Sequence, residues 1–188
     1  MENNNWHKSA QIFIEELSSS NPTPGGGAGG AIAGAMGCAL AKMSASTTLK
    51  LKKTPEENKI AIETFVSEIE ELKNNLTNAS AEDAKVYGLY IEAKKIDKEN
   101  PERKIKMQEA LVNSAFVPLN ACKICSESLN KISAIESKIS DIIMSDIVCA
   151  KNLLNCAKKC LLENVKINLN YIKDEQVKQK LEQEISKL

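Results

Sequence analysis

Seven of the eight glycines in this chain lie within thirteen residues, from Gly25 to Gly37. They follow the segment Pro22-Thr23-Pro24, and the small residues after them are compatible with the start of a helix. A glycine-rich turn that leads into a helix presents backbone N–H groups without intrahelical acceptors, which is a common type of anion site. Pro24 and Gly25, Gly26 and Gly27 are therefore candidate ligand-binding residues.

The same glycines also have a purely structural interpretation. Gly26, Gly30 and Gly34 recur every four residues, and Gly37 and Ala41 extend the row. This spacing predicts a smooth helix face against which a second helix packs closely. A nucleotide-binding phosphate loop is excluded, because no Gly-Lys-Ser/Thr follows at the required spacing. The sequence leaves open whether the glycines serve packing alone or packing together with a ligand-binding turn.

Length and charge limit the class of protein. A chain of 188 residues predicts a single domain, residues 1–188. Its 25 basic and 25 acidic residues balance, so we expect neither a nucleic-acid nor a membrane partner. No apolar run approaches about 20 residues, and the N-terminus lacks the pattern of a signal peptide. We therefore expect a cytoplasmic protein with reduced cysteines.

Apolar residues recur at helical spacing along nearly the whole chain, with proline and glycine between the segments. The helices expected from this pattern cover residues 6–18, 27–48, 55–96 with or without a break near 78, 101–139, about 145 to beyond 165, and 174–187. No segment shows sustained two-residue alternation of β-forming residues. The sequence thus predicts an all-α fold, a multihelical bundle with close helix contacts within a protomer or across a homodimer.

Two cysteine pairs have spacings that suggest a metal site, Cys122-x-x-Cys125 and Cys156-x-x-x-Cys160. Both pairs fall on predicted apolar helix stripes, where cysteine behaves as a small hydrophobic residue. No compact turn surrounds either pair, and the single histidine, His7, is near the N-terminus. We expect core packing and no metal.

Without a central histidine, acid–base chemistry would fall to Asp, Glu, Lys or Tyr. Asp83 is the first candidate, because it shares a predicted helix face with Tyr87 and Tyr90. A carboxylate held beside phenols on a packed helix can have a raised pKa. The alternative is that Asp83 and Glu82 are ordinary acids in the first turn of a helix.

Two further candidates have strong structural alternatives. Asp146 is the second candidate acid or base, although Ser145-Asp146 is also typical of a helix N-cap and first turn. Lys52 belongs to a basic run that follows the glycine helix. Such a run usually complements the helix dipole, but it can also receive the carboxylate of a ligand.

Several short segments occur in an order that is informative as a set. They are Pro22–Ala28 with the glycine/alanine helix and Met43 after it, Glu82–Tyr87, Val117–Leu119, Ser145-Asp146 and Asn164–Leu169. Over roughly residues 8–175, their order and spacing resemble the cyclodeaminase domain of formiminotransferase-cyclodeaminase. The same domain stands alone in bacterial methenyltetrahydrofolate cyclohydrolases.

The chain departs from this family pattern at three places. Ala28 stands where the family usually has serine after the three glycines. The segment Leu49-Lys50-Leu51-Lys52 replaces the frequent Ile-Gly-Lys-Lys, and the Asn-Pro-Asn often found before Ser145-Asp146 is absent. These departures concern the substrate more than the fold.

The resemblance implies an all-α homodimer that hydrolyses 5,10-methenyltetrahydrofolate to 10-formyltetrahydrofolate, with folate as substrate and no cofactor. It implies catalytic roles for Asp83 and Asp146, and substrate contacts from Pro24, Gly25, Gly26, Gly27, Lys52, Tyr87 and Asn168. A formimidoyltetrahydrofolate cyclodeaminase that releases ammonia is the alternative, and the lack of a formiminotransferase domain favours the cyclohydrolase. A non-catalytic helical dimer that serves as a binding or scaffold protein is the third interpretation.

Overall fold

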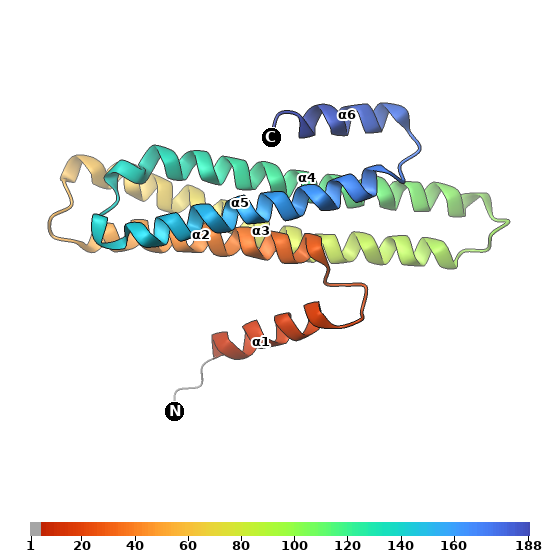
Figure 1. Ribbon diagram of the computed structural model, residues 1–188, viewed down its shortest axis with the longest axis horizontal. Helices are drawn as coiled ribbons and strands as arrows, with labels where there is room; N and C mark the ends of the chain where they lie inside the picture. The colour runs from red at the N-terminus through yellow and green to blue at the C-terminus, as the bar shows by residue number, and fades with distance from the viewer. Residues whose placement is uncertain (1–4) are drawn as a thin grey trace.

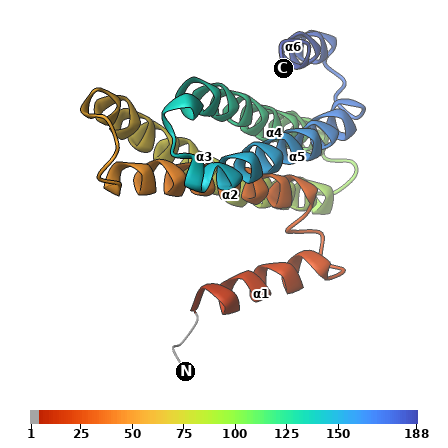
Figure 2. The same cartoon turned by 60° about the vertical axis from the view of Figure 1, so that its left-hand side comes forward.

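The computed structural model describes residues 5–188, and four long helices of this range pack side by side as a bundle (Figure 1). The elements are α1 (Asn5–Ser18), α2 (Gly26–Lys50), α3 (Glu56–Lys95), α4 (Pro101–Ile135), the 3₁₀ turns η1 (Glu136–Lys138) and η2 (Asp141–Ile143), α5 (Met144–Leu169) and α6 (Glu175–Ile185). Helices α2 to α5 form the bundle, while α1 and α6 lie on its outside (Figure 2). No strand occurs within residues 5–188, which confirms the predicted all-α bundle.

Some predicted boundaries differ from the observed ones. Helix α3 is continuous through Asn78, and α4 continues through Pro118 but ends at Ile135. In the turn before α3, the hydroxyl of Thr54 donates a hydrogen bond to the carbonyl of Thr48. Residues 1–4, part of the stretch that lacks a signal-peptide pattern, lie outside the described residues. None of the helices in residues 5–188 has the length and apolar character needed to cross a membrane.

Helix α2 packs against α3 and α5 through its small residues. A Cβ atom added at Gly37 would lie 2.8 Å from Cγ of Leu154 and 2.9 Å from the carbonyl oxygen of Ala150 on α5. At Gly34 it would lie 3.1 Å from Sγ of Cys125 on α4. The missing side chains therefore let α4 and α5 approach α2 closely, which confirms the packing role predicted for this part of the row.

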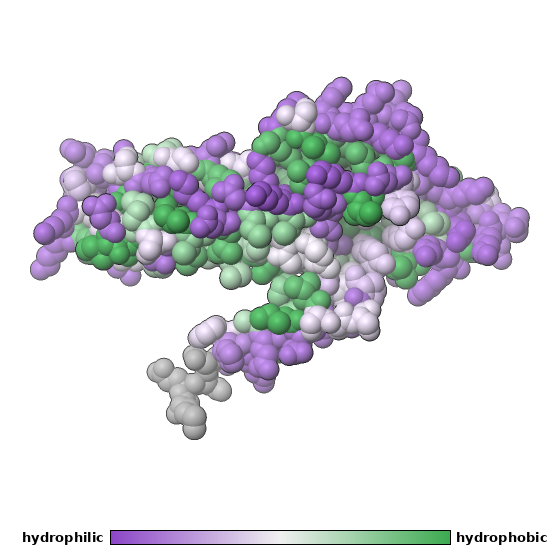
Figure 3. Space-filling model, viewed as in Figure 1, coloured by the Kyte–Doolittle hydropathy of each residue, from purple (hydrophilic) through white to green (hydrophobic). Residues whose placement is uncertain are grey.

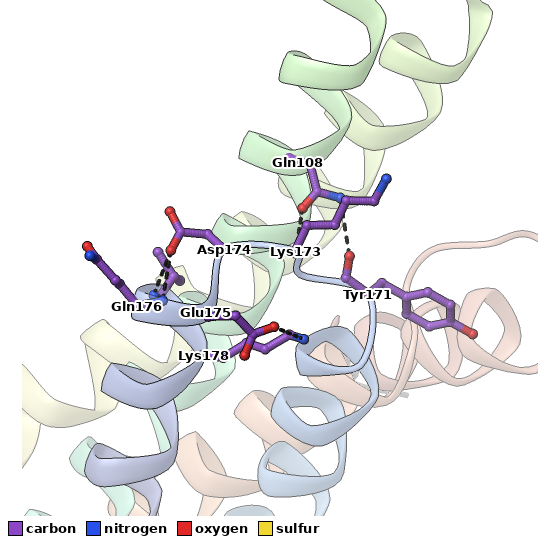
Figure 4. A network of polar contacts seen from close by, with 8 residues as sticks. Gln108, Tyr171, Lys173, Asp174, Glu175, Gln176 and Lys178 are labelled. Atoms are coloured by element: carbon purple, nitrogen blue, oxygen red, sulfur yellow. Dashed lines mark hydrogen bonds and ion pairs between the residues drawn. The ribbon is translucent and has the colours of Figure 1, made fainter.

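An apolar cluster between α4, α5 and α6 holds α6 against the bundle. Its buried members are Leu111, Ala115, Leu119, Val165, Ile172 and Leu181. Gln108 of α4 holds the turn between α5 and α6, because its side chain donates to the Tyr171 carbonyl at 3.2 Å and accepts from the Lys173 N–H at 2.8 Å (Figure 4). Asp174 then caps α6 by accepting from two N–H groups of its first turn. These bonds fix Tyr171, whose ring points away from the network (Figure 4).

The cysteines divide into two groups. Cys122 and Cys125 are buried in the core as expected, and burial raises the pKa of their thiols to about 11 and about 12. Cys156 and Cys160 are exposed, so the expectation that they pack in the core is wrong. Helix α5 instead turns Leu154, Ala157 and Leu161 inward. Within residues 5–188, no group of three or more His, Cys, Asp or Glu side chains is placed to hold a metal ion.

Gly37→Ala should lower the free energy of unfolding by about 1 kcal/mol or more. The new methyl group would press on a backbone carbonyl, and overpacking of this kind outweighs the better helix propensity of alanine. Urea unfolding measures the difference. Gly88→Ala is the matched control, since a Cβ there meets nothing within 4 Å, and it should stabilise the protein by about 0.5–1 kcal/mol. Equal stabilisation by both changes would contradict the close packing of α2 on α5.

Candidate active site

Asp83 lies directly against the glycine turn. A Cβ atom added at Gly27 would lie 2.3 Å from Oδ1 and 2.6 Å from Oδ2 of Asp83, so only glycine leaves room for this carboxylate. Gly27 is buried and Asp83 is half-buried. Asp83 stands far inside α3, which begins at Glu56, so the alternative that it is a first-turn acid is wrong.

Two opposing effects act on the Asp83 carboxylate. The backbone N–H of Ala28, in the first turn of α2, donates a hydrogen bond to it and favours the charged form. Burial disfavours the charged form and is the larger effect, so it raises the pKa of Asp83 above the ordinary 3.8. The result is a fixed carboxylate that is more basic than an exposed aspartate. The helix start predicted to bind an anion therefore receives, at Ala28, an anion of the protein itself.

Pro24 and Gly25 form the turn that precedes α2. Both are half-buried, and Gly25 occupies the N-cap position of α2 without a side chain to cap it. The Thr23–Pro24 peptide bond is cis. These residues lie next to the Asp83–Gly27 contact, and their role in substrate binding stays a prediction.

Two asparagines of α5 line the same end of the bundle. A Cβ atom at Gly26 would lie 3.1 Å from Nδ2 of Asn164. Asn168 donates through Nδ2 to the carbonyl oxygens of Asn164 at 2.8 Å and Ser114 at 2.9 Å, which fixes its side chain between α5 and α4. Asn164 is not among the residues predicted for the site, although its spacing of four from Asn168 on a helix is a signal that could have found it.

A cavity of about 180 Å³ begins one helical turn from Asp83. Its lining residues are Tyr87, Tyr90, Leu111, Ser114, Asn168 and Tyr171. The rings of Tyr87 and Tyr90 lie 6.3 Å apart, and Tyr87 is 37% exposed. The three tyrosine rings and the fixed amide of Asn168 surround a small cavity, and such a lining suits a ligand with a flat ring and polar edges.

The other two predicted site residues lie at the opposite end of the bundle. Asp146 is in the first turn of α5, 18 residues before Asn164, which corresponds to about 27 Å along a helix. Lys52 is exposed in the turn between α2 and α3. A separate cavity of about 310 Å³ lies at this end, where Lys53 and Lys138 line it. Within one chain, Asp83 therefore shares no site with Asp146 or Lys52, and their roles stay predictions.

Several known proteins are similar to this chain. A methenyltetrahydrofolate cyclohydrolase from Methylorubrum extorquens is 34% identical over 144 residues, which cover 74% of this chain and 69% of that protein. The formimidoyltransferase-cyclodeaminase of Sus scrofa is 27% identical over 186 residues, which cover 97% of this chain and 34% of that protein. The chain thus spans about two thirds of the bacterial relative and one third of the animal one.

The fold is also similar to a solved structure. The crystal structure of a formiminotetrahydrofolate cyclodeaminase from Thermotoga maritima superimposes with a TM-score of 0.85 at 28% identity, covering 94% of this chain and 86% of that chain. The sequence profile of formiminotransferase-cyclodeaminase matches residues 9–187. Because the match includes almost the whole chain, the protein belongs to the formiminotransferase-cyclodeaminase family.

Proposed function

We propose that this protein is an enzyme that hydrolyses 5,10-methenyltetrahydrofolate to 10-formyltetrahydrofolate. The observation that carries the proposal is the half-buried Asp83 carboxylate, held over Gly27 with a raised pKa one turn from a cavity lined by tyrosines. The similarity to a methenyltetrahydrofolate cyclohydrolase, which extends over 74% of this chain, supports the choice of substrate.

The reaction needs one group that accepts and returns a proton. The bridging carbon of the substrate belongs to an amidinium cation between N5 and N10, and water adds to this carbon. Asp83 accepts the proton of the water as the new C–O bond forms. The negative charge of Asp83 also stabilises the cationic reactant before the proton moves.

Breakdown of the tetrahedral carbon completes the reaction. Asp83 returns its proton to N5 as the bond between N5 and the carbon breaks. The hydroxyl group on the carbon loses its proton and becomes the formyl carbonyl on N10, so one proton is released in total. Neither step requires a metal or a nucleotide, and we propose none. Tyr87 and Asn168 would hold the folate rings beside Asp83.

A cyclodeaminase activity is the second candidate. In that reaction N10 attacks a formimino carbon on N5 and ammonia leaves, which again passes through a tetrahedral carbon between the two nitrogens. The similarity to the Thermotoga maritima cyclodeaminase over 94% of this chain favours it. A scaffold role has less support, because Ala28 contacts Asp83 through its backbone N–H, and the replacement of serine by alanine leaves that contact intact.

We also propose that the protein acts as a homodimer in the cytoplasm. Lys52 and Asp146 lie about 27 Å or more along the helices from the Asp83 end, so they would act on the same substrate only if a second copy supplied them. Light scattering on the purified full chain should give twice its mass of 20.6 kDa. A mass of 20.6 kDa at all concentrations would reject the homodimer.

Asp83→Asn should lower kcat by about 100-fold or more, because the amide cannot accept the proton of the attacking water. The loss of near-ultraviolet absorbance as methenyltetrahydrofolate is hydrolysed measures the rate. Asp97→Asn is the control, since Asp97 is exposed in the loop after α3 and should be replaceable without effect. Near-normal turnover by Asp83→Asn would remove this residue from the mechanism. Ammonia release from formiminotetrahydrofolate without cyclohydrolase activity would favour the second candidate.

Asp83→Asn should also stabilise the protein at neutral pH. Burial raises the pKa of Asp83 in the folded state, so the fold favours the protonated carboxyl over the charged carboxylate. As pH rises through that pKa, Asp83 ionises and the free energy of unfolding falls. The advantage of the variant should therefore be largest at pH 7 and shrink as pH falls towards 3.8. Urea unfolding at several pH values measures this, with Asp97→Asn again as the control. A constant difference between variant and wild type would contradict the raised pKa.

A further inference from the structure

Helix α1 stands apart from the bundle. None of its residues is buried, and it runs back beneath α2 from the point where the two are joined (Figures 1 and 2). It approaches α2 at Leu17, whose Cδ2 lies 3.5 Å from where a Cβ of Gly29 would be. From there the two helices diverge, and Figure 3 shows an open wedge between α1 and the bundle.

The side of α1 that faces this wedge is apolar. Ala10, Phe13 and Leu17 follow each other at spacings of three and four, and Ile14 lies beside them. Ile14 is 61% exposed and Leu17 is 40% exposed. Hydrophobic residues of α1 are visible on its upper side in Figure 3, with hydrophilic residues beneath.

The side of α2 that faces the wedge is apolar as well. Starting from Gly29, helical spacing places Ala33, Met36, Leu40 and Met43 on the same face. Met36 is 54% exposed and Met43 is 41% exposed. The one charged residue between Gly26 and Lys50 is Lys42, which pairs with Glu70 on α3 at 2.9 Å. A surface of this kind fits an uncharged, apolar helix.

We propose that α2 of a second copy occupies the wedge, antiparallel to the first α2 and covered by α1. This rests on the homodimer proposed above. A two-fold axis near residue 38 places Met36 opposite the partner's Leu40, and Ala33 opposite the partner's Met43. At Ala33 and the partner's Met43 a small residue then faces a large one, and Met36 and the partner's Leu40 form an apolar contact at the centre of the interface.

Charge complementarity supports the antiparallel direction. Glu15 and Glu16 lie near the end of α1, close to the start of α2, whereas Lys50 and Lys53 lie at the far end of α2. Within residues 5–188, none of these four takes part in an ion pair. The two-fold axis brings the partner's Lys50 to Glu16, so that acids and bases left unpaired in one chain meet across the interface.

The arrangement also affects the active site. It brings the partner's Lys52 towards the turn at Gly25–Gly27, which is the end of the bundle that holds Asp83. Each dimer would then have two equivalent sites, one at each end of the α2 pair.

The test is the dissociation constant of the full-length dimer, measured by sedimentation equilibrium. Met36→Glu and Ile14→Glu should each raise it by about tenfold or more, because each buries an unpaired charge in the interface. Ile105→Glu is the control, since Ile105 is 59% exposed on α4, outside the wedge, and its change should leave the constant as in the wild type. Circular dichroism checks that each variant folds. If Met36→Glu fails to fold, Ile14→Glu decides, because α1 has no buried residue.

A charge exchange tests the direction of packing. Glu16→Lys and Lys50→Glu should each weaken the dimer, and the double variant should recover most of the loss. If the wild type is a dimer but neither Met36→Glu nor Ile14→Glu weakens it, the interface lies elsewhere and only the homodimer survives. If the double charge variant is weaker than both single variants, the antiparallel direction is wrong. A wild type that is monomeric at every concentration would reject the homodimer and this interface together.

Discussion

The fold and the candidate site both depend on the missing Cβ atoms of α2. At Gly37 their absence lets α5 approach until a backbone carbonyl is within reach of where a side chain would begin. At Gly27 the same absence opens a space on the α3 side, which the Asp83 carboxylate fills. One row of small residues thus sets the distances between helices and the position of the Asp83 carboxylate. Gly34 and Gly37 therefore serve helix packing, while Gly27, at the start of the same helix, leaves space for the carboxylate that we propose as the catalytic group.

The Asp83 carboxylate, proposed as the general base, is both buried and hydrogen-bonded at the start of α2. A carboxylate in an apolar bundle would ordinarily become neutral, because burial removes its hydration. The N–H of Ala28 supplies a donor that partly replaces water, so the pKa rises but the charged form keeps a partner. The same contact fixes the direction of the carboxylate relative to the tyrosines one turn further along α3. The contact between α2 and α3 therefore fixes the position of the carboxylate, whereas its burial between the helices makes it more basic.

The sequence was sufficient where the signal is local. Helical spacing and the prolines located all six helices, and the contacts of Gly34 and Gly37 match the predicted smooth face. It failed where the outcome depends on neighbouring helices. Cys156 and Leu154 both fit an apolar stripe, but only packing against α2 decides which of the two faces inward. Asp83 could be mistaken for a first-turn acid because nothing local shows that α3 continues through Asn78.

The distance along a helix between two motifs can be calculated from the sequence, but matching the motifs to a family does not take it into account. At about 1.5 Å per residue, α2 alone separates Gly27 from Lys52 by more than 30 Å. The order of motifs along the chain therefore does not show that their residues lie close together in one bundle. In the proposed dimer, however, the two α2 helices are antiparallel. The two-fold axis then places the end of one α2 beside the start of the other. The proposed dimer would therefore explain three features together: the apolar face of α2, the detached α1, and the division of the predicted site residues between two ends of the bundle.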